Sequence, residues 1–297
     1  LCSVFRVPMA ILPKIECSQH LYGETDSSIF GSSIQIGGIL GDQQSSLFGQ
    51  GCTNTGQTKN TYGTGSFVLQ HTGNEALTEN GSLIATLACT RAGFETEYAL
   101  EGSIFVTGAA VQWLRDGLGI ISNASETESL AASLRNNGDV WFVPALTGLG
   151  APSWDPFARG LIVGLTRGST RAHLVRATLE SMAYQTRDVV DEIVRQTGIE
   201  IIELKADGGA SKNNWLMQFQ ADLLGMPVVV SPYSDATSMG SAIAAGLTSG
   251  LWSSCDDLYF AQPESARFEP SMSRDERDAL YQRWGMAVER SKGWAHP

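Results

Sequence analysis

At two places in the sequence, a short apolar strand leads through glycine into a helix. Ile201 to Ala206 predicts a strand, Gly208-Gly209 a sharp turn, and Asn213 to Leu224 a helix. Earlier in the chain, Ile34 to Leu40 predicts a short buried strand and Gln43 to Gln50 a short helix. Strands that enter helices through glycine turns are typical of α/β layer folds, which bind ligands at the strand ends.

The other elements fit the same fold class. A long helix is predicted from Arg171 to Gln196, because apolar residues recur at helical spacing and Gly198 follows as a natural stop. Ser273 and Glu276 form a capping-box pattern that opens a last helix, which runs to about Arg290. Further strands are predicted at 58–62, 66–70, 83–89, 96–101, 140–146 and 228–230, and further helices at 105–118, 126–134 and 236–245. The element order is βββα(α)βαβα with a trailing helix.

The charge and cysteine content exclude several classes of protein. The formal net charge is −11 and no basic run is present, so neither a nucleic-acid partner nor an anionic membrane surface is expected. The five cysteines are scattered and form no C-x-x-C pair, which favours reduced thiols in a cytoplasmic protein. The four histidines are dispersed without metal-ligand spacing, so we expect no protein metal site.

Asp42 is a candidate general base. It follows an apolar strand and Gly41, at the start of a helix, where a carboxylate is well placed to accept a hydroxyl proton. Position alone favours a different interpretation, in which Asp42 is the N-cap of that helix.

Three glycine-containing segments are candidates for contact with a phosphate or nucleotide. Tyr62 to Ser66 is a tight loop in which backbone N–H groups and the Thr64 hydroxyl can approach an anion, or it is an ordinary hairpin turn. Asp207 to Ala210 joins a strand to a helix, as a nucleotide loop or as a structural turn. Gly108 and Gln112 share a helix face, a spacing that by itself favours helix packing.

Longer motifs resemble the FGGY family of carbohydrate kinases, and within it the members that phosphorylate glycerol. The run Gly160-Leu-Ile-Val-Gly-Leu165, followed after seven residues by His173-Leu-x-x-Ala-Thr-Leu-Glu180, resembles the C-terminal signature of the family. Further matching motifs stand in the same order along the chain: 41–44, 60–65, 99–102, 112–116, 148–160, 207–210 and 216–220. The resemblance covers about residue 8 to the C-terminus. It implies an actin/Hsp70/hexokinase-type (RNase H-like) ATPase domain, a mixed sheet flanked by helices.

The resemblance also implies roles for individual residues. Asp42 matches the catalytic base of the family, Gln43 its neighbour at the polyol, and Phe67 an apolar contact to the polyol carbon chain. Thr64 matches a contact to the nucleotide phosphates. Four more residues match positions around ATP: Gly108, Gln112, Gly209 and Asn213. The implied substrates are ATP and glycerol, with Mg²⁺ as cofactor, and the full-length protein can form a homo-oligomer.

Kinases of this family have two domains with the active site between them. We expect residues 1–33 to be the tail of an N-terminal domain and a linker, and residues 34–297 to be the C-terminal kinase domain. Because phosphoryl transfer depends on positioning by both walls, we expect negligible activity and at best weak ATP binding from this chain alone. Two alternatives stay open: a sibling kinase acting on another sugar, or a non-catalytic nucleotide-binding module.

Overall fold

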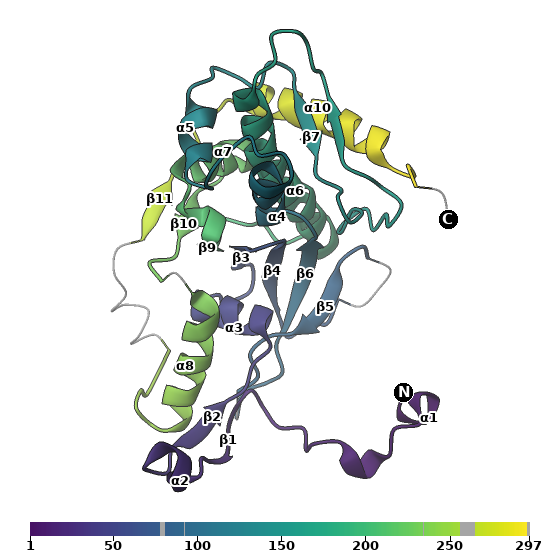
Figure 1. The fold of residues 1–297 in the computed structure, drawn as a ribbon. Helices are drawn as coiled ribbons and strands as arrows, with labels where there is room; N and C mark the ends of the chain where they lie inside the picture. Colours follow the sequence, from purple (N-terminus) through teal and green to yellow (C-terminus); the bar gives the residue numbers. More distant parts are fainter. Residues whose placement is uncertain (78–80, 92, 234, 256–264, 296–297) are drawn as a thin grey trace.

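A computed structural model describes residues 1–77, 81–91, 93–233, 235–255 and 265–295. These residues form a central seven-stranded sheet with the order β11-β10-β9-β3-β4-β6-β5 (Figure 1). Strands β3, β9 and β10 are parallel and the other pairings in this sheet are antiparallel, so the sheet is mixed. The strands are β3 (Thr58–Tyr62), β4 (Ser66–Gly73), β5 (Ile84–Leu87), β6 (Tyr98–Ile104), β9 (Leu204–Gly208), β10 (Val228–Val230) and β11 (Ala266–Phe268).

The strand register decides which side chains share a face of the sheet. Residues directly opposite one another on neighbouring strands point to the same side, and so do residues two apart along a strand. Lys59 of β3 pairs with Lys205 of β9 and with Leu69 of β4. One face therefore carries two adjacent rows, Lys205–Lys59–Leu69–Glu101 and Asp207–Thr61–Phe67–Ser103.

The opposite face of the sheet is covered by the long helix α6 (Arg171–Thr197). Val189, Val190 and Ile193 of this helix pack with Val68 and Ile104 of the sheet. The helix ends at Gly198, whose φ of 65° lies in the left-handed region, which confirms the predicted stop. At its start, the Nδ1 atom of His173 accepts a hydrogen bond from the backbone N–H of Thr170 at 3.1 Å.

Further elements pack around α6 and complete this layer: α4 (Gly108–Gln112), α5 (Glu126–Ala132), α7 (Asn214–Leu224), α10 (Arg274–Ser291) and the hairpin of β7 (Trp141–Val143) and β8 (Leu161–Val163). The rings of Tyr184 on α6 and Trp284 on α10 stack with centroids 5.3 Å apart. Asp188 on α6 accepts hydrogen bonds from the Tyr281 hydroxyl at 2.7 Å and the Trp284 indole at 2.9 Å. These contacts fix α10 against α6 (Figure 1).

The face that carries Lys59 is covered by α3 (Asp42–Gly49), which crosses α8 (Ala236–Thr248). A Cβ atom at Gly240 of α8 would overlap the backbone carbonyl of Ser45, so glycine permits the close approach of the two helices. The Ser45 hydroxyl donates to the carbonyl of Thr237 at 2.6 Å. Leu47 packs with Leu69 of the sheet, and together these contacts fix where α3 begins.

The first 40 residues differ from the prediction. They contain α1 (Cys2–Phe5), a 3₁₀ turn (Met9–Ile11), β1 (Gln19–Glu24), α2 (Ser27–Phe30) and β2 (Gln35–Gly38). Strand β1 had no counterpart in the prediction, yet it pairs with β2 in an antiparallel hairpin beside α8 (Figure 1). The prediction that Ile34 to Leu40 form a buried strand is wrong about the burial. Ile34, Ile36 and Ile39 are 49%, 40% and 56% exposed, because the hairpin faces α8 through Gly37 and Gly38. The division of the chain at residue 33 stays a prediction.

None of the helices in the described part of the chain is both long enough and apolar enough to cross a membrane.

Candidate active site

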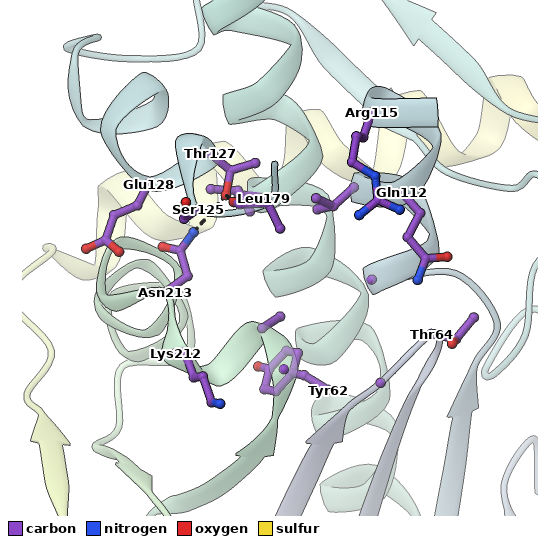
Figure 2. A pocket seen from close by; sticks show the side chains of 16 residues that line it. Tyr62, Thr64, Gln112, Arg115, Ser125, Thr127, Glu128, Leu179, Lys212 and Asn213 are labelled. Carbon is purple, nitrogen blue, oxygen red and sulfur yellow. Dashed lines mark hydrogen bonds between the residues drawn. The ribbon is translucent and has the colours of Figure 1, made fainter. Parts of the chain in front are cut away.

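A cavity of about 480 Å³ lies where β3 and β9 end, under helices α4, α5 and α7 (Figure 2). All five residues that the sequence analysis connected with the nucleotide line it: Thr64, Gly108, Gln112, Gly209 and Asn213. They come from three separate segments of the chain, so the fold brings them together. Figure 2 shows Gln112 and Arg115 on one side of the cavity, Asn213 and Thr127 on the other, and Tyr62 and Thr64 at the strand ends.

The loop of Thr64 is a hairpin turn that also lines the cavity. It joins β3 to β4, and its backbone holds the start of α4: Gly108 N–H donates to the carbonyl of Gly63 at 3.1 Å. A Cβ atom at Gly108 would lie 2.5 Å from that carbonyl oxygen. The loop and α4 therefore meet backbone to backbone. The expected hairpin turn is confirmed, and the contact of this loop with an anion stays a prediction.

The two glycines of the turn after β9 differ in the space around them. Gly208 has a φ of 92°, and a Cβ atom there would overlap the carbonyl of Tyr62, so this position needs glycine. Gly209 has no heavy atom within 4 Å of an added Cβ, and it lines the cavity. Asn213 then caps α7: its side-chain oxygen accepts from the Leu216 N–H at 3.0 Å. Its amide donates to the hydroxyl of Thr127 at 3.1 Å.

Two cationic side chains at the cavity were absent from the predicted set. The Arg115 guanidinium is paired with Asp116 at 2.7 Å. Lys212 follows Gly209 in the same turn, is exposed, and has no side-chain partner among the described residues. An unpaired ammonium at the mouth of a cavity attracts a phosphate group. Its place three residues after Gly209 is the signal by which the sequence could have revealed it.

Asp42 is the first residue of α3, and it does not cap the helix. Gly41 occupies the N-cap position, and the Asp42 carboxylate accepts the Gln43 backbone N–H at 2.8 Å. The Gln43 amide donates to the other carboxylate oxygen at 3.3 Å. The side chain is exposed, so its carboxylate is accessible to a substrate. The interpretation of Asp42 as an N-cap is therefore wrong.

A buried lysine lies beneath this carboxylate. Lys59 has no exposed surface, and its Nζ donates to the side-chain oxygen of Gln43 at 2.7 Å and to the Thr61 hydroxyl at 2.9 Å. Burial lowers the pKa of Lys59 to about 8, against the opposing effect of the carboxylates of Asp207, Glu101 and Asp42. Sequence reasoning missed Lys59, although a lysine inside a predicted strand is an unusual feature.

Asp207 links the two parts of the site, which are the cavity and the region around Asp42 and Lys59. Its side chain lies on the α3 face of the sheet beside Thr61, and the Gln50 amide donates to it at 3.0 Å. Burial raises the pKa of this carboxyl. Two residues further on, Gly209 lines the cavity. Phe67 is the neighbour of Thr61 across the β3–β4 pair, so it shares this face with Asp207.

Within the described residues, no group of three or more His, Cys, Asp and Glu side chains is arranged to hold a metal ion.

Comparison with known proteins gives the family. The FGGY family of carbohydrate kinases, C-terminal domain, matches residues 58–249. Glycerol kinase 2 of Thermotoga maritima is 53% identical over 291 residues, which is 98% of this chain and 58% of that protein. The chain thus spans little more than half the length of this curated relative.

Solved structures agree with the sequence matches. The structure of Plasmodium falciparum glycerol kinase with ADP has a TM-score of 0.89 and 37% identity, over 98% of this chain and 58% of that chain. The structure of a ligand-bound xylulose kinase from Lactobacillus acidophilus has a TM-score of 0.80 at 20% identity, over 97% of this chain and 59% of the other, and shows the fold alone. The expected actin/Hsp70/hexokinase-type fold, a mixed sheet flanked by helices, is confirmed. With the family matching residues 58–249, the chain belongs to the FGGY family of carbohydrate kinases.

Proposed function

We propose that this chain forms one wall of a kinase that transfers the γ-phosphoryl group of ATP to glycerol and yields glycerol 3-phosphate. The observation that carries the proposal is that one cavity is lined by Thr64, Gly108, Gln112, Gly209 and Asn213, at the ends of β3 and β9, the strands on which α3 packs. The names of the relatives at 53% and 37% identity favour glycerol as the acceptor.

In the proposed reaction the cavity holds ATP. The backbone of Gly63-Thr64 and of Gly209 allows the nucleotide to approach closely, and Lys212 adds a positive charge at the rim. Gln112 and Asn213 supply polar groups from opposite sides of the cavity (Figure 2). These residues bind and orient the nucleotide, so that its terminal phosphate points toward the acceptor.

Asp42 is the proposed general base. Its exposed carboxylate accepts the proton of the attacking glycerol hydroxyl while the oxygen–phosphorus bond forms and ADP leaves. Gln43 donates an amide N–H toward the same hydroxyl, and the Phe67 ring contacts the carbon chain of the polyol. In this arrangement Asp42 and Gln43 form hydrogen bonds with the hydroxyls of glycerol. The Phe67 ring contacts the carbon chain and thereby fixes the orientation of the substrate.

Mg²⁺ is proposed to reach the site on the phosphates of ATP. Mg²⁺ in kinases is usually held by substrate phosphates and water together with one or two carboxylates, so it needs no dedicated protein cage. When bound, it neutralises charge on the transferring phosphoryl group.

The proposed activity belongs to a protein longer than this chain. The relative from Thermotoga maritima extends over more sequence, of which the chain matches 58%. We propose that residues 34–297 form the C-terminal kinase domain, and that residues 1–33 lead into it from another domain. The complete protein is proposed to work in the cytoplasm, and the chain alone to transfer phosphate negligibly. Self-association of the complete protein is testable by its mass in solution.

The test uses the longest open reading frame that contains this chain, with the 297-residue chain alongside. We expect ATP-dependent phosphorylation of glycerol, followed as ADP release, in the longer protein only. A panel with xylulose and gluconate tests the alternative acceptors, and a preference for either would contradict glycerol. A longer protein that binds ATP but phosphorylates no acceptor would favour a binding module.

The variant Asp42→Asn tests the base. It should lower kcat by about 10²- to 10⁴-fold. Asp275→Asn is the matched control, because Asp275 is also an exposed aspartate in the first turn of a helix, far along the chain on α10. Activity of Asp42→Asn near that of the control would remove Asp42 from the proposed role.

A further inference from the structure

We propose that Lys59 is a positioning residue for the reaction: its ammonium group holds the Gln43 side-chain amide in one orientation, with the N–H₂ end toward Asp42 and the acceptor hydroxyl. The inference rests on the proposed function. It adds a buried residue that touches neither substrate but decides what Gln43 presents to them.

The first observation is the burial of an unpaired charge. Lys59 is 0% exposed, and its nitrogen is bound by two neutral oxygens, those of Gln43 and Thr61, with no ion pair in the described part of the chain. Lysine is almost never fully buried without a charged partner, because removing the ammonium from water is costly. If Lys59 only filled space, an apolar side chain at this position would make the fold more stable.

The second observation is the direction of the hydrogen bonds. An ammonium group can only donate, so it meets the oxygen of the Gln43 amide, at 2.7 Å. The amide nitrogen is then left on the other side, where it donates to the Asp42 carboxylate at 3.3 Å. A reversed amide would place its oxygen against that carboxylate and its N–H₂ group against the ammonium. Lys59 therefore selects the orientation in which Gln43 offers donors.

The third observation is that Lys59 ties the sheet to the start of α3. Its second acceptor, Thr61, also shares a hydrogen bond of 2.8 Å with the hydroxyl of Ser46 on α3. The helix that begins at Asp42 is thus joined to β3 through Gln43 and again through Ser46, one turn later. Loss of the ammonium would loosen the first of these connections and leave the second.

The charge on Lys59 is sensitive to pH in an accessible range. The titratable groups around it are Asp42 on α3, Cys52 after that helix, Glu101 on β6, and Asp207 and Lys205 on β9. Burial outweighs the attraction of the carboxylates and lowers the pKa of Lys59 to about 8. Above that pH the neutral amine can accept as well as donate, so only the Asp42 carboxylate still opposes a reversed amide. The orientation of Gln43 should accordingly be held by two groups below about pH 8 and by one group above it, where the reversed amide gains population.

The kinetic test compares Lys59→Met and Lys59→Arg with wild type in the longest open reading frame that contains the chain. Lys59→Met should lower kcat by about 10- to 100-fold at neutral pH, because a misplaced group costs rate rather than nucleotide affinity. The KM for ATP should stay unchanged. Wild-type kcat should fall above about pH 8, and Lys59→Arg, which stays protonated, should keep its rate there.

Lys205→Met is the matched control. Lys205 lies beside Lys59 in the same row, but its Nζ donates to the carbonyls of Gln50 and Gly51 at the far end of α3. Its loss should leave kcat at neutral pH unchanged. Equal losses in the two variants would overturn the inference, since removing any lysine from this row would then have the same effect.

If the arginine of Lys59→Arg does not fit the buried site, a double-mutant cycle still tests the inference. If Lys59 acts through Gln43, Lys59→Met should cost little further kcat in a Gln43→Met background. Full additivity of the two losses would overturn the inference. Thermal unfolding gives a second distinction: Lys59→Met should raise Tm, because it removes a buried charge, while it lowers kcat. A parallel fall in both would mean a merely structural role.

A direct readout separates this inference from the proposed function. In the ¹⁵N-labelled 297-residue chain, the side-chain amide signals of Gln43 should shift with a midpoint near pH 8, and the shift should be absent in Lys59→Met. Signals that do not respond to pH would overturn the inference. A longer protein that phosphorylates no acceptor, combined with this pH-dependent shift, would overturn the proposed function and leave the contact between Lys59 and Gln43 established.

Discussion

The side-chain amide of Asn213 donates to the hydroxyl of Thr127 at 3.1 Å, which links the start of α7 to α5 along one side of the cavity (Figure 2). The oxygen of the same amide accepts the Leu216 N–H at 3.0 Å and caps α7. One residue thus serves the stability of a helix with its oxygen and the shape of the cavity with its nitrogen. Substitutions can separate these two contributions.

Asn213→Asp keeps the cap and removes the donor to Thr127. We expect the free energy of unfolding to change little, and the KM for ATP to rise about tenfold, because a carboxylate also repels the phosphates. Asn214→Asp is the control, since it adds the same charge at the neighbouring exposed position outside the cavity. Asn213→Ala should instead cost about 1 kcal/mol of stability, measured by urea unfolding. Equal KM values for the two aspartate variants would contradict a specific role for Asn213.

Gly208 and Gly209 are adjacent and should respond in opposite ways to alanine. Gly209→Ala adds a methyl group to open space in the cavity, so Tm should stay the same while the affinity for ATP falls. Gly208→Ala forces a Cβ atom into the carbonyl of Tyr62 at a φ of 92°, so Tm should fall. Thermal unfolding and ATP titration of both variants check this pair. Unchanged ATP affinity in a folded Gly209→Ala variant would show that the methyl group meets no nucleotide.

The elements that the sequence predicted well are those whose signal is local. Strand β10 matches its predicted bounds, because three valines favour an extended chain between a proline and a turn. The long helix ends where Gly198 can adopt a positive φ. Strands β8 and β11 were missed because each is three residues long and is defined by pairing with β7 or β10. Strand β1 was missed for the same reason, since only its partner β2 gives it a register.

In the candidate site, too, local patterns predicted less than features that depend on several segments of the chain. Spacing alone favoured helix packing for Gly108 and Gln112 and a cap for Asp42. Only the resemblance to a family, which draws on whole motifs, favoured the functional interpretation of these candidates over the structural one. Lys59 was missed because strand alternation gives two faces and does not say which helix covers each. The burial of its ammonium depends on α3, and the position of α3 depends on its close crossing with α8 at Gly240, which is a tertiary property.

Phe67 should contribute to binding glycerol more than to the chemical step. It lies in the row of Asp207 and Thr61 and is only partly buried, which leaves ring surface for a ligand. Phe67→Ala should raise the KM for glycerol about tenfold with a smaller change in kcat, because the ring contacts ground state and transition state alike. Phe94→Ala, at a ring that is 65% exposed beside Arg91, is the control. A loss confined to kcat would contradict this role.

Asp188 makes the stability of the α6–α10 contact depend on pH. Burial is the largest influence on this carboxyl and raises its pKa from 3.8 to about 6, although Tyr281 and Trp284 donate to the ionised form. Between these two values the folded protein holds a proton that the unfolded chain releases. The contribution of Asp188 to stability is therefore fully present below about pH 4, is lost as the pH rises through about 6, and is constant above that.

Asp188→Asn removes this titration, so the difference in unfolding free energy between wild type and variant measures it alone. That difference should shift steadily in favour of the variant between about pH 4 and about pH 6 and then level off. Urea unfolding at a series of pH values checks the slope, and Asp275→Asn, at an exposed side chain in the first turn of α10, serves as the control. A difference that is independent of pH over this range would mean that Asp188 ionises as readily in the folded protein as in the unfolded chain. The hydrogen bonds from Tyr281 and Trp284 would then fully offset the cost of burying its charge.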